Sequence, residues 1–409
     1  MAIFNKILFN NISLILLMLS FFTALSDRIM GRNAFFLSVI MMLLINIKNI
    51  EFSLKKILVP LTTLIFGVAL WVWYHLYCQQ DNTFFLANQN YNIISRYMIF
   101  IGIALFFIQC IKPIYYGPSL RVLILTISTC SFIYVCGVGF FYFLSHPSAR
   151  IRIDSAATIS AYIVTLQCLF TIYIINLFSV KFKKYLISLV IALGFITLSL
   201  TETRSAILCF PIIIFIYFFN PKLFVRKKYI AYYTSIFILL SLCIKTFFPL
   251  TIERLASSYT EISEMSVNND SSIGARVSMW QSGIYTFTKH PFGQSPSSRF
   301  QDVIHYIDSK EHGNPEGKRN SVYHLHNDLI ERLSLQGVLG GISYILLLAS
   351  IIYFAYKENR FREYFVLFIL PIISFGSVDT LFIDKRFIIV FGAQLLLFNF
   401  FQRKNFQEK

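Results

Sequence analysis

The chain has 409 residues, of which 56% are hydrophobic and 14% charged, and its mean hydropathy is +0.65. Apolar runs of about twenty residues recur along most of its length, which excludes a soluble globular protein and predicts an all-α, polytopic membrane protein. The net charge of +16 would favour nucleic acid as the partner of a soluble protein. In a membrane protein, positive charge instead gathers on one side, so we expect membrane lipids and no nucleic acid as partners.

Twelve apolar runs, separated by charged or turn-forming residues, are predicted to cross the membrane. Two boundaries are weakly marked, because only residues 201–204 part the seventh and eighth runs and only 384–386 part the last two, so ten or eleven spans stay open. No small-residue cleavage site follows the first run, which we therefore interpret as a retained anchor. The predicted spans are residues 7–25, 34–47, 57–77, 91–111, 122–143, 156–178, 185–200, 205–219, 229–248, 338–356, 364–383 and 387–401.

The distribution of Lys and Arg orients these spans. Nineteen such residues lie in connections on the side of the N-terminus, and seven lie in the short connections on the other side. The positive-inside rule then predicts that both termini are cytoplasmic. Residues 1–248 hold the first nine spans, residues 249–337 form a large outer loop with its own helices, and residues 338–409 hold the last three spans and a cytoplasmic tail.

Two groups of arginines lie near the predicted outer ends of spans. Arg150 and Arg152 lie beside Asp154 and are most simply an interfacial cluster, although either arginine could extend a phosphate site. Arg204 lies in the peptide TETRS at 201–205, where a cation at membrane depth is costly unless it is paired or faces a polar cavity. An interfacial position or a pair with Glu202 is the alternative interpretation.

The outer loop contains a predicted amphipathic helix. Apolar residues repeat at alternating spacings of four and three after Ser271 and Ser272, which can cap the helix. Arg276, in the peptide Gly-Ala-Arg at 274–276, lies at the edge of this apolar stripe and could present its guanidinium to phosphate oxygens, or could be an ordinary exposed residue. Residues 293–322 mix Gly, Pro, Ser and charges without a period, and we expect an irregular or mobile loop.

The peptide HLHND at 324–328 has the most suggestive composition. A helix is predicted to begin at Asn327 or Asp328 and to end at Gly337, which places His326 at a helix N-terminus. Imidazole can accept a proton near neutral pH, and unpaired backbone donors favour anionic ligands there. The spacing also permits a metal site with His324, His326 and Asp328 as ligands, although three ligands at a helix start need a strained geometry.

Taken together, the TETRS, Gly-Ala-Arg and HLHND peptides, their order and their common outer placement resemble the O-antigen ligases, within a wider group of membrane glycosyltransferases that includes O-antigen polymerases. The resemblance covers about residues 60 to 400 and is sharpest from 201 to 340. It implies a bundle of about twelve transmembrane helices with a periplasmic helical subdomain. It also implies a location in the inner membrane of Gram-negative bacteria with a periplasmic active site.

The resemblance assigns roles to individual residues. Arg204 and Arg276 are expected to bind the diphosphate of an undecaprenyl-diphosphate-linked O-antigen donor, and His326 is expected to be catalytic. His324, Asn327 and Arg152 are expected to support the site. The acceptor is expected to be lipid A-core, and no cofactor and no metal are expected.

Three further expectations come from the residues. Asp379 is expected to pair structurally with Lys385 or Arg386, and the alternative is that it helps to shape the cavity. The chain has no GxxxxGK[ST] and no GxGxxG peptide, so nucleotide binding of these kinds is not predicted. An O-antigen polymerase remains the nearest alternative function. A flippase is a second, disfavoured because the charges gather on the outer face rather than inside several spans.

Overall fold

The computed structural model describes residues 2–47, 57–79, 81, 85–110, 118–147, 149–178, 180–218, 227–265, 269–311, 313–358, 360 and 362–402. Within these ranges every regular element is a helix and no strand occurs, which confirms the predicted fold class. The first elements are α1 (Ala2–Ser26), α2 (Arg28–Asn46), α3 (Leu58–Trp73) with the π-helix η3 (Tyr74–Cys78), α4 (Phe85–Cys110), α5 (Pro118–Ser145), α6 (Ala157–Leu177), α7 (Lys183–Leu200) and α8 (Arg204–Phe218). There follow α9 (Lys227–Phe247), α10 (Pro249–Glu264), α11 (Ser272–Lys289), α12 (Pro296–Lys310), α13 (Pro315–Ser321), α14 (Asp328–Lys357), η5 (Arg362–Ile369), α15 (Leu370–Gly376), η6 (Leu381–Ile383) and α16 (Lys385–Gln402).

Among the described residues, eight helices are long and apolar enough to cross a membrane, and a ninth crossing arises if the helices on either side of a 101° bend between α9 and α10 count as one. The predicted number of twelve is therefore not confirmed, although each predicted span overlaps a helix. The 15 residues of α8 explain part of the difference. At about 1.5 Å per residue they extend about 22 Å, less than the roughly 30 Å of a hydrocarbon core. The helix at Glu363–Gly376 is short in the same way.

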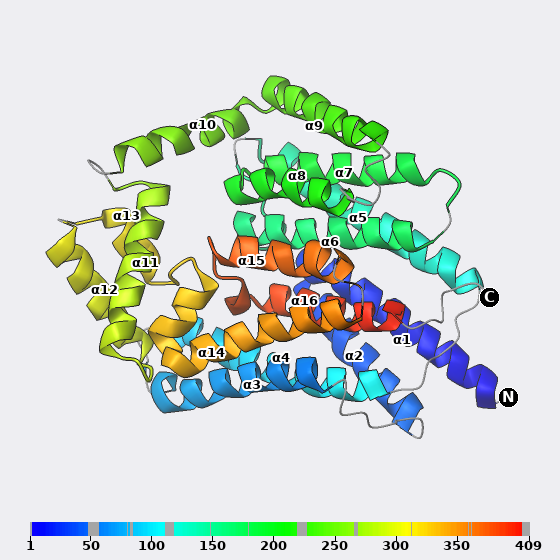
Figure 1. The fold of residues 1–409 in the computed structure, drawn as a ribbon, viewed down its shortest axis with the longest axis horizontal. Coiled ribbons are helices and arrows are strands. Elements are labelled where there is room, and N and C mark those ends of the chain that lie inside the picture. Colours follow the sequence, from blue (N-terminus) through cyan, green and yellow to red (C-terminus); the bar gives the residue numbers. More distant parts are fainter. Residues whose placement is uncertain are drawn as a thin grey trace.

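The centre of the bundle is formed by α6 and α16. In α6, 94% of the apolar window is buried, against 33% in α5, so α6 lies in the core and α5 at the periphery. The apolar side chains of α16 from Phe387 to Phe401 are buried as well. Figure 1 shows α15 and α16 between α6 and α14, with the pair α3 and α4 on the far side of α14. This arrangement places the chain segments before α14 and after α15 at one end of the bundle.

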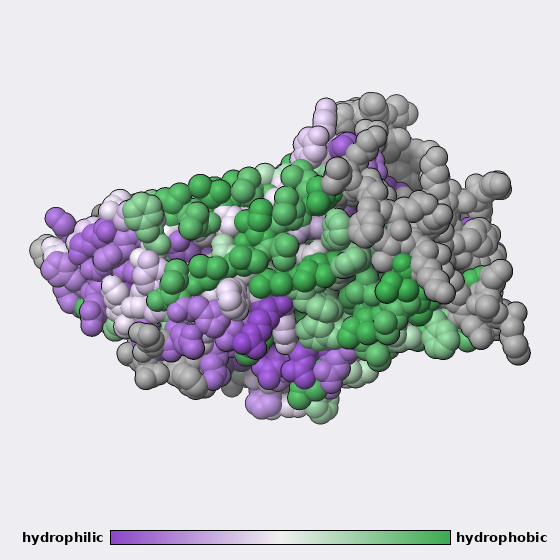
Figure 2. All heavy atoms as spheres, turned by 90° about the horizontal axis from the view of Figure 1, so that it is seen from below, coloured by the Kyte–Doolittle hydropathy of each residue, from purple (hydrophilic) through white to green (hydrophobic). Residues whose placement is uncertain are grey.

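Helices α10 to α13 gather at that same end, and both chain termini lie at the other (Figure 1). The space-filling view of Figure 2 shows hydrophilic side chains gathered at the α11–α13 end and hydrophobic ones along the bundle. The predicted helix after Ser271 is confirmed as α11, where the Ser271 hydroxyl accepts from the N–H of Gly274 at 3.1 Å.

The prediction of an irregular segment at 293–322 was wrong. Much of it forms α12 and α13, because Ser295 and Asn314 cap their N-termini with their side-chain oxygens and Pro296 and Pro315 occupy the first helical turns. Proline suits the first turn, whose N–H groups lack intrahelical partners. The apolar residues at 300, 303, 304 and 307 repeat at helical spacing and should have indicated α12, whereas the seven residues of α13 have no such pattern.

The helix expected to end at Gly337 is continuous with the following span but breaks at that residue. Gly337 has φ 66° and ψ −154°, a backbone conformation that favours glycine. The N–H of Val338 donates to the carbonyl of Pro291 at 2.8 Å, so the break lets α14 contact the loop after α11. The N-terminal part of α14 thereby connects α11 and the loop after it to the bundle.

Candidate active site

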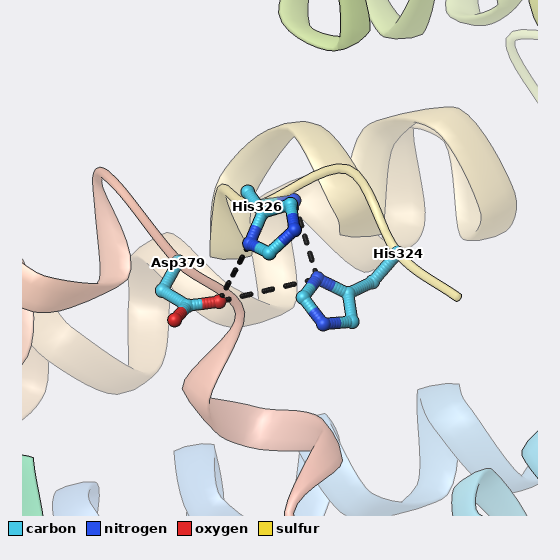
Figure 3. Close-up of side chains that lie close together, drawn as sticks. All are labelled: His324, His326 and Asp379. Atoms are coloured by element: carbon cyan, nitrogen blue, oxygen red, sulfur yellow. Dashed lines mark hydrogen bonds and ion pairs between the residues drawn. The ribbon is translucent and has the colours of Figure 1, made fainter. Parts of the chain in front are cut away.

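The site forms where the loop before α14 meets the loop after α15. Nδ1 of His326 lies 2.9 Å from Oδ1 of Asp379, and Nδ1 of His324 lies 4.0 Å from the same oxygen (Figure 3). The N–H of Thr380 also donates to this oxygen, at 2.9 Å. The side chains of both histidines and of Asp379 are largely shielded from solvent.

The first turn of α14 holds both of these loops. On the histidine side, Oε2 of Glu331 accepts from the N–H of Leu325 at 2.8 Å. On the aspartate side, Oδ1 of Asp328 accepts from the N–H of Phe382 at 3.1 Å, and Nη2 of Arg332 donates to the carbonyl of the same residue at 2.8 Å. These contacts fix the positions of His326 and Asp379 relative to one rigid helix.

Asn327 adds a further connection between the loops. Its side-chain oxygen caps α14 by accepting from the N–H of Ile330 at 3.0 Å, and its Nδ2 donates to the carbonyl of Ser377 at 2.9 Å. The structure therefore places Asn327, predicted to support the site, in a positioning role.

A buried ion pair fixes Glu331 in turn. Nη1 of Arg299, from α12, donates to Oε1 of Glu331 at 2.8 Å, and the hydroxyl of Tyr91, from α4, donates to the same oxygen at 2.5 Å. All three side chains are buried. Because loss of one partner of a buried pair leaves an uncompensated charge, these contacts hold α12, α4 and the first turn of α14 together.

Electrostatics favour an ionised Asp379 and a neutral His324. Burial opposes ionisation of Asp379, but His326, His324 and Arg276 outweigh it and hold the pKa of its carboxyl below the usual range. Burial lowers the pKa of His324 to about 4, and His326 acts in the same direction. An ionised carboxylate can only accept, so Nδ1 of His326 carries the hydrogen in this bond, and in the neutral ring the lone pair is then on Nε2.

A cavity of about 250 Å³ adjoins His326. Four arginines and two glutamates line it, which gives an excess of two positive charges. The basic and polar lining favours an anionic ligand. The lining residues are Arg150, Thr158, Glu202, Thr203, Arg204, Ser205, Arg254, Ser272, Arg276, Met279, Glu316, Asn320 and His326.

Both arginines predicted to bind diphosphate line this cavity. Nη2 of Arg204 donates to Glu261 at 2.6 Å and to Ser257 at 2.9 Å, while its Nε and Nη1 are buried without a hydrogen-bond partner in the described part of the chain. Arg276 forms no ion pair with a described carboxylate, although it lies within electrostatic reach of Asp379. Unpaired guanidinium donors in a basic cavity are suited to phosphate oxygens.

Arg150 also lines the cavity, whereas Arg152, the neighbouring arginine predicted to support the site, does not. Arg150 lines the cavity and donates to the carbonyl of Thr201 at 3.0 Å and to the hydroxyl of Thr203 at 3.4 Å. Burial and neighbouring Arg254 lower the pKa of Arg150 to about 10. Arg152, predicted to support the site, is exposed and does not line the cavity.

Two cavity residues have left-handed backbones. Glu202 has φ 52° and His326 has φ 51°, and residues other than glycine rarely adopt such values. A strained conformation costs about 1–3 kcal/mol and persists only where its surroundings hold it. For His326 those surroundings are the contacts from the first turn of α14.

The structure corrects two sequence-based interpretations. Asp379 does not pair with Lys385 or Arg386 but with His326, and Arg386 instead pairs with Asp154 at 2.9 Å. In the peptide HLHND, Asp328 does not join the two histidines, because it is the N1 residue of α14 and bonds Phe382. The carboxylate beside both histidines is Asp379, 53 residues after His326.

Sequence reasoning therefore named Asp379 but favoured the wrong partner for it, and of the two neighbouring arginines it chose Arg152 rather than Arg150. One signal for Asp379 was present, since an acidic residue just after an apolar run must be paired or solvated. No local signal distinguished its true partner from the nearer cations at 385 and 386. The buried triad of Tyr91, Arg299 and Glu331 joins three distant segments and left no trace in local patterns.

Comparison with known proteins agrees with the motifs. Residues 189–345 match the model of the O-antigen ligase family. That region contains Arg204, Arg276 and His326, while Asp379 lies beyond it. Over 365 residues the chain is 26% identical to the O-antigen ligase of Escherichia coli strain K12, an alignment that covers 87% of this chain and 84% of that relative. The resemblance to the O-antigen ligases that the three motifs predict is thus confirmed.

Proposed function

We propose that this chain is an O-antigen ligase that transfers O-antigen polysaccharide from undecaprenyl diphosphate to lipid A-core on the periplasmic face of the inner membrane. The observation that carries the proposal is the pair formed by His326 and Asp379 beside a cavity lined by arginines. A general base and an anion site side by side are what attack on a glycosyl diphosphate requires.

The arginines are assigned to the donor. Cleavage of the bond between the anomeric carbon and the diphosphate leaves negative charge on a phosphate oxygen. The unpaired guanidinium donors of Arg204, and the guanidinium of Arg276, can bind this diphosphate and stabilise it as it departs. Only the part of this interaction that strengthens in the transition state increases kcat.

His326 is assigned to the acceptor. Its Nε2 carries the lone pair and accepts the proton of the attacking sugar hydroxyl, which is typically worth about 10²- to 10⁴-fold in rate. Asp379 holds the ring in the required tautomer and stabilises the imidazolium that forms, as the carboxylate does in a Ser-His-Asp triad. Direct attack opposite the departing diphosphate inverts the anomeric carbon.

The position of the cavity fits a reaction at the periplasmic surface of the inner membrane. The cavity is built from residues at the ends of bundle helices and from α11 and α13, at the end of the bundle opposite the termini. Cytoplasmic termini, as the charge distribution predicts, would place it in the periplasm. Since that side has no pool of nucleoside triphosphates, the energy of transfer comes from the lipid-linked donor.

The test uses cells that make lipid-linked O-antigen and lipid A-core but lack their own ligase. We expect His326→Ala and Arg276→Ala, present at normal membrane levels, to lose glycan attached to lipid A-core while long lipid-linked polymer accumulates. His290→Ala and Arg319→Ala, which change residues outside the cavity, serve as matched controls. Loss of chain length with single repeats still attached would identify a polymerase instead, and unchanged attachment would remove both residues from the site.

A further inference from the structure

Three side chains from two separate loops converge at one point beside the cavity. One ligand atom from each of His324, His326 and Asp379 lies within 4.8 Å of the other two. The rings of the two histidines meet edge to face, with centroids 4.1 Å apart. Figure 3 shows both rings directed toward the same carboxylate oxygen.

The electron pairs at this point are not fully matched by donors. Nδ1 of His324 accepts from the N–H of His326 at 3.4 Å, so it carries a lone pair rather than a hydrogen. That lone pair faces the ionised Asp379 at 4.0 Å, with no hydrogen between the two atoms. Oδ2 of Asp379 is buried and has no hydrogen-bond partner in the described ranges.

We propose that His324, His326 and Asp379 bind a divalent transition-metal ion of the Zn²⁺ class, with water as the fourth ligand. Imidazole nitrogens and a carboxylate oxygen are common ligands of this ion, and three protein ligands plus water form a typical open site. Bonds of about 2.0–2.1 Å at the tetrahedral angle place ligand atoms about 3.3 Å apart. This value lies between the 2.9 and 4.0 Å found here, so small ring movements suffice. Mg²⁺ prefers an octahedral shell of oxygen atoms and is not expected to bind.

The ion is an inhibitor of the reaction, an inference that rests on the proposed function. The form of His326 that can accept a proton in the proposed function is the neutral ring with its hydrogen on Nδ1. A metal ion bound to Nδ1 moves that hydrogen to Nε2, and no proton is gained or lost. Nε2 then has no lone pair to accept the proton of the acceptor hydroxyl. The ion also takes the carboxylate oxygen that orients the ring.

Binding is measured on the purified full-length chain in detergent after treatment with EDTA. Titration with Co²⁺ alone should produce the visible absorption of tetrahedral Co²⁺ at one ion per chain, and Zn²⁺ should displace it. His324→Ala removes one ligand and should abolish this absorption. His290→Ala removes another imidazole that lies beside a carboxylate, Asp302, at 3.1 Å, and should leave the absorption unchanged. Absence of the absorption in the unmodified chain, or its persistence in His324→Ala, would overturn the metal site.

A second measurement separates the metal site from the proposed function. Zn²⁺ at about ten times its dissociation constant should lower the transfer rate about tenfold in the unmodified chain, and EDTA should restore it. The rate of His324→Ala, relative to its own metal-free rate, should be insensitive to the same concentration. Stoichiometric binding without inhibition would keep the metal site and overturn the role of His326 as proton acceptor.

Discussion

Nδ1 of His326 lies 2.9 Å from Oδ1 of Asp379, although 53 residues and a membrane-length helix separate the two in sequence. The pair exists because α14 carries the chain from the cavity end of the bundle to the opposite end, and η5 and α15 return it. Asp328 and Glu331, in the first turn of α14, then hold the loops on either side of the pair. The function of the pair formed by His326 and Asp379 can be tested without removing the imidazole.

Asp379→Asn tests the orienting role of the carboxylate. Asparagine keeps the shape but can donate through its amide, so His326 is free to place its hydrogen on Nε2, the wrong nitrogen for a base. We expect kcat to fall on the order of 10²- to 10⁴-fold, with little change in KM for the lipid-linked donor. Steady-state transfer kinetics measure this, with Asp302→Asn as the control, because that carboxylate also pairs with a histidine, His290, but lies outside the cavity. A change confined to KM would argue against the orienting role.

Arg204→Lys and Arg276→Lys test whether these two arginines bind the diphosphate of the donor. Lysine keeps the charge but loses the planar fork of donors, so two-oxygen contacts are lost. Each variant should raise the KM for the donor and lower kcat/KM about 10- to 200-fold, corresponding to about 1.5–3 kcal/mol for hydrogen bonds to a charged group. The exposed Arg319, changed to lysine, is the matched control. Equal kinetics in all three variants would exclude these arginines from donor binding.

Arg150 and Arg152 form a natural comparison, because they are two residues apart and only Arg150 lines the cavity. Arg150→Ala should lower kcat/KM at least tenfold, since it removes a cation from the cavity and leaves the carbonyl of Thr201 without its donor. Arg152→Ala should change kcat/KM less than twofold, because water and salt screen an exposed charge, so its removal has little effect on binding. The reverse order, measured in the same transfer assay, would restore Arg152 to the site and remove Arg150.

The buried pair of Arg299 and Glu331 should separate stability from catalysis. Arg299→Met leaves a buried carboxylate without its main partner and should cost about 3–5 kcal/mol of stability. In the double variant Arg299→Met with Glu331→Leu, no charge is left unpaired, so the midpoint of thermal unfolding should recover in part. Activity should not recover, because the N–H of Leu325 loses its acceptor beside His326. Recovery of both together would show that Glu331 acts only through stability.

The sequence predicted those features that depend on local pattern. The apolar runs gave an all-helical membrane bundle, and the three peptides gave Arg204, Arg276 and His326, which the structure brings to one cavity. The number of crossings could not be predicted, because the apolar run at 205–219 gives the length of α8 but not whether so short a helix crosses, and nothing in the apolar pattern reveals that α9 bends against α10.

The partners of buried charges were beyond sequence reasoning for a different reason. Asp379 has two cations close by in sequence, at 385 and 386, and a single chain offers no reason to prefer a histidine 53 residues away. The preference arises from tertiary packing, because α16 begins after a short 3₁₀ turn, η6, and Arg386 reaches Asp154 instead. The helix α12 was missed although its apolar residues at 300, 303, 304 and 307 have the spacing of an amphipathic helix. The seven-residue α13 was missed because it is stabilised by its cap and by contacts with α11 rather than by such a pattern.

Gly337→Ala tests whether the break in α14 is needed to assemble the site. An added Cβ would lie 2.2 Å from the carbonyl oxygen of Pro291, and the φ of 66° is unfavourable for alanine, so the loop after α11 must shift. We expect a loss of at least about 1–3 kcal/mol of stability and a lower transfer rate. In Gly137→Ala the new Cβ meets no atom within 4 Å, and this variant, also inside a helix, should be as stable as the parent or slightly more stable. Thermal unfolding in detergent and transfer assays on both variants provide the comparison. If Gly337→Ala unfolds and reacts like Gly137→Ala, the contact between α14 and the loop after α11 is dispensable, and the first turn of α14 positions His326 without it.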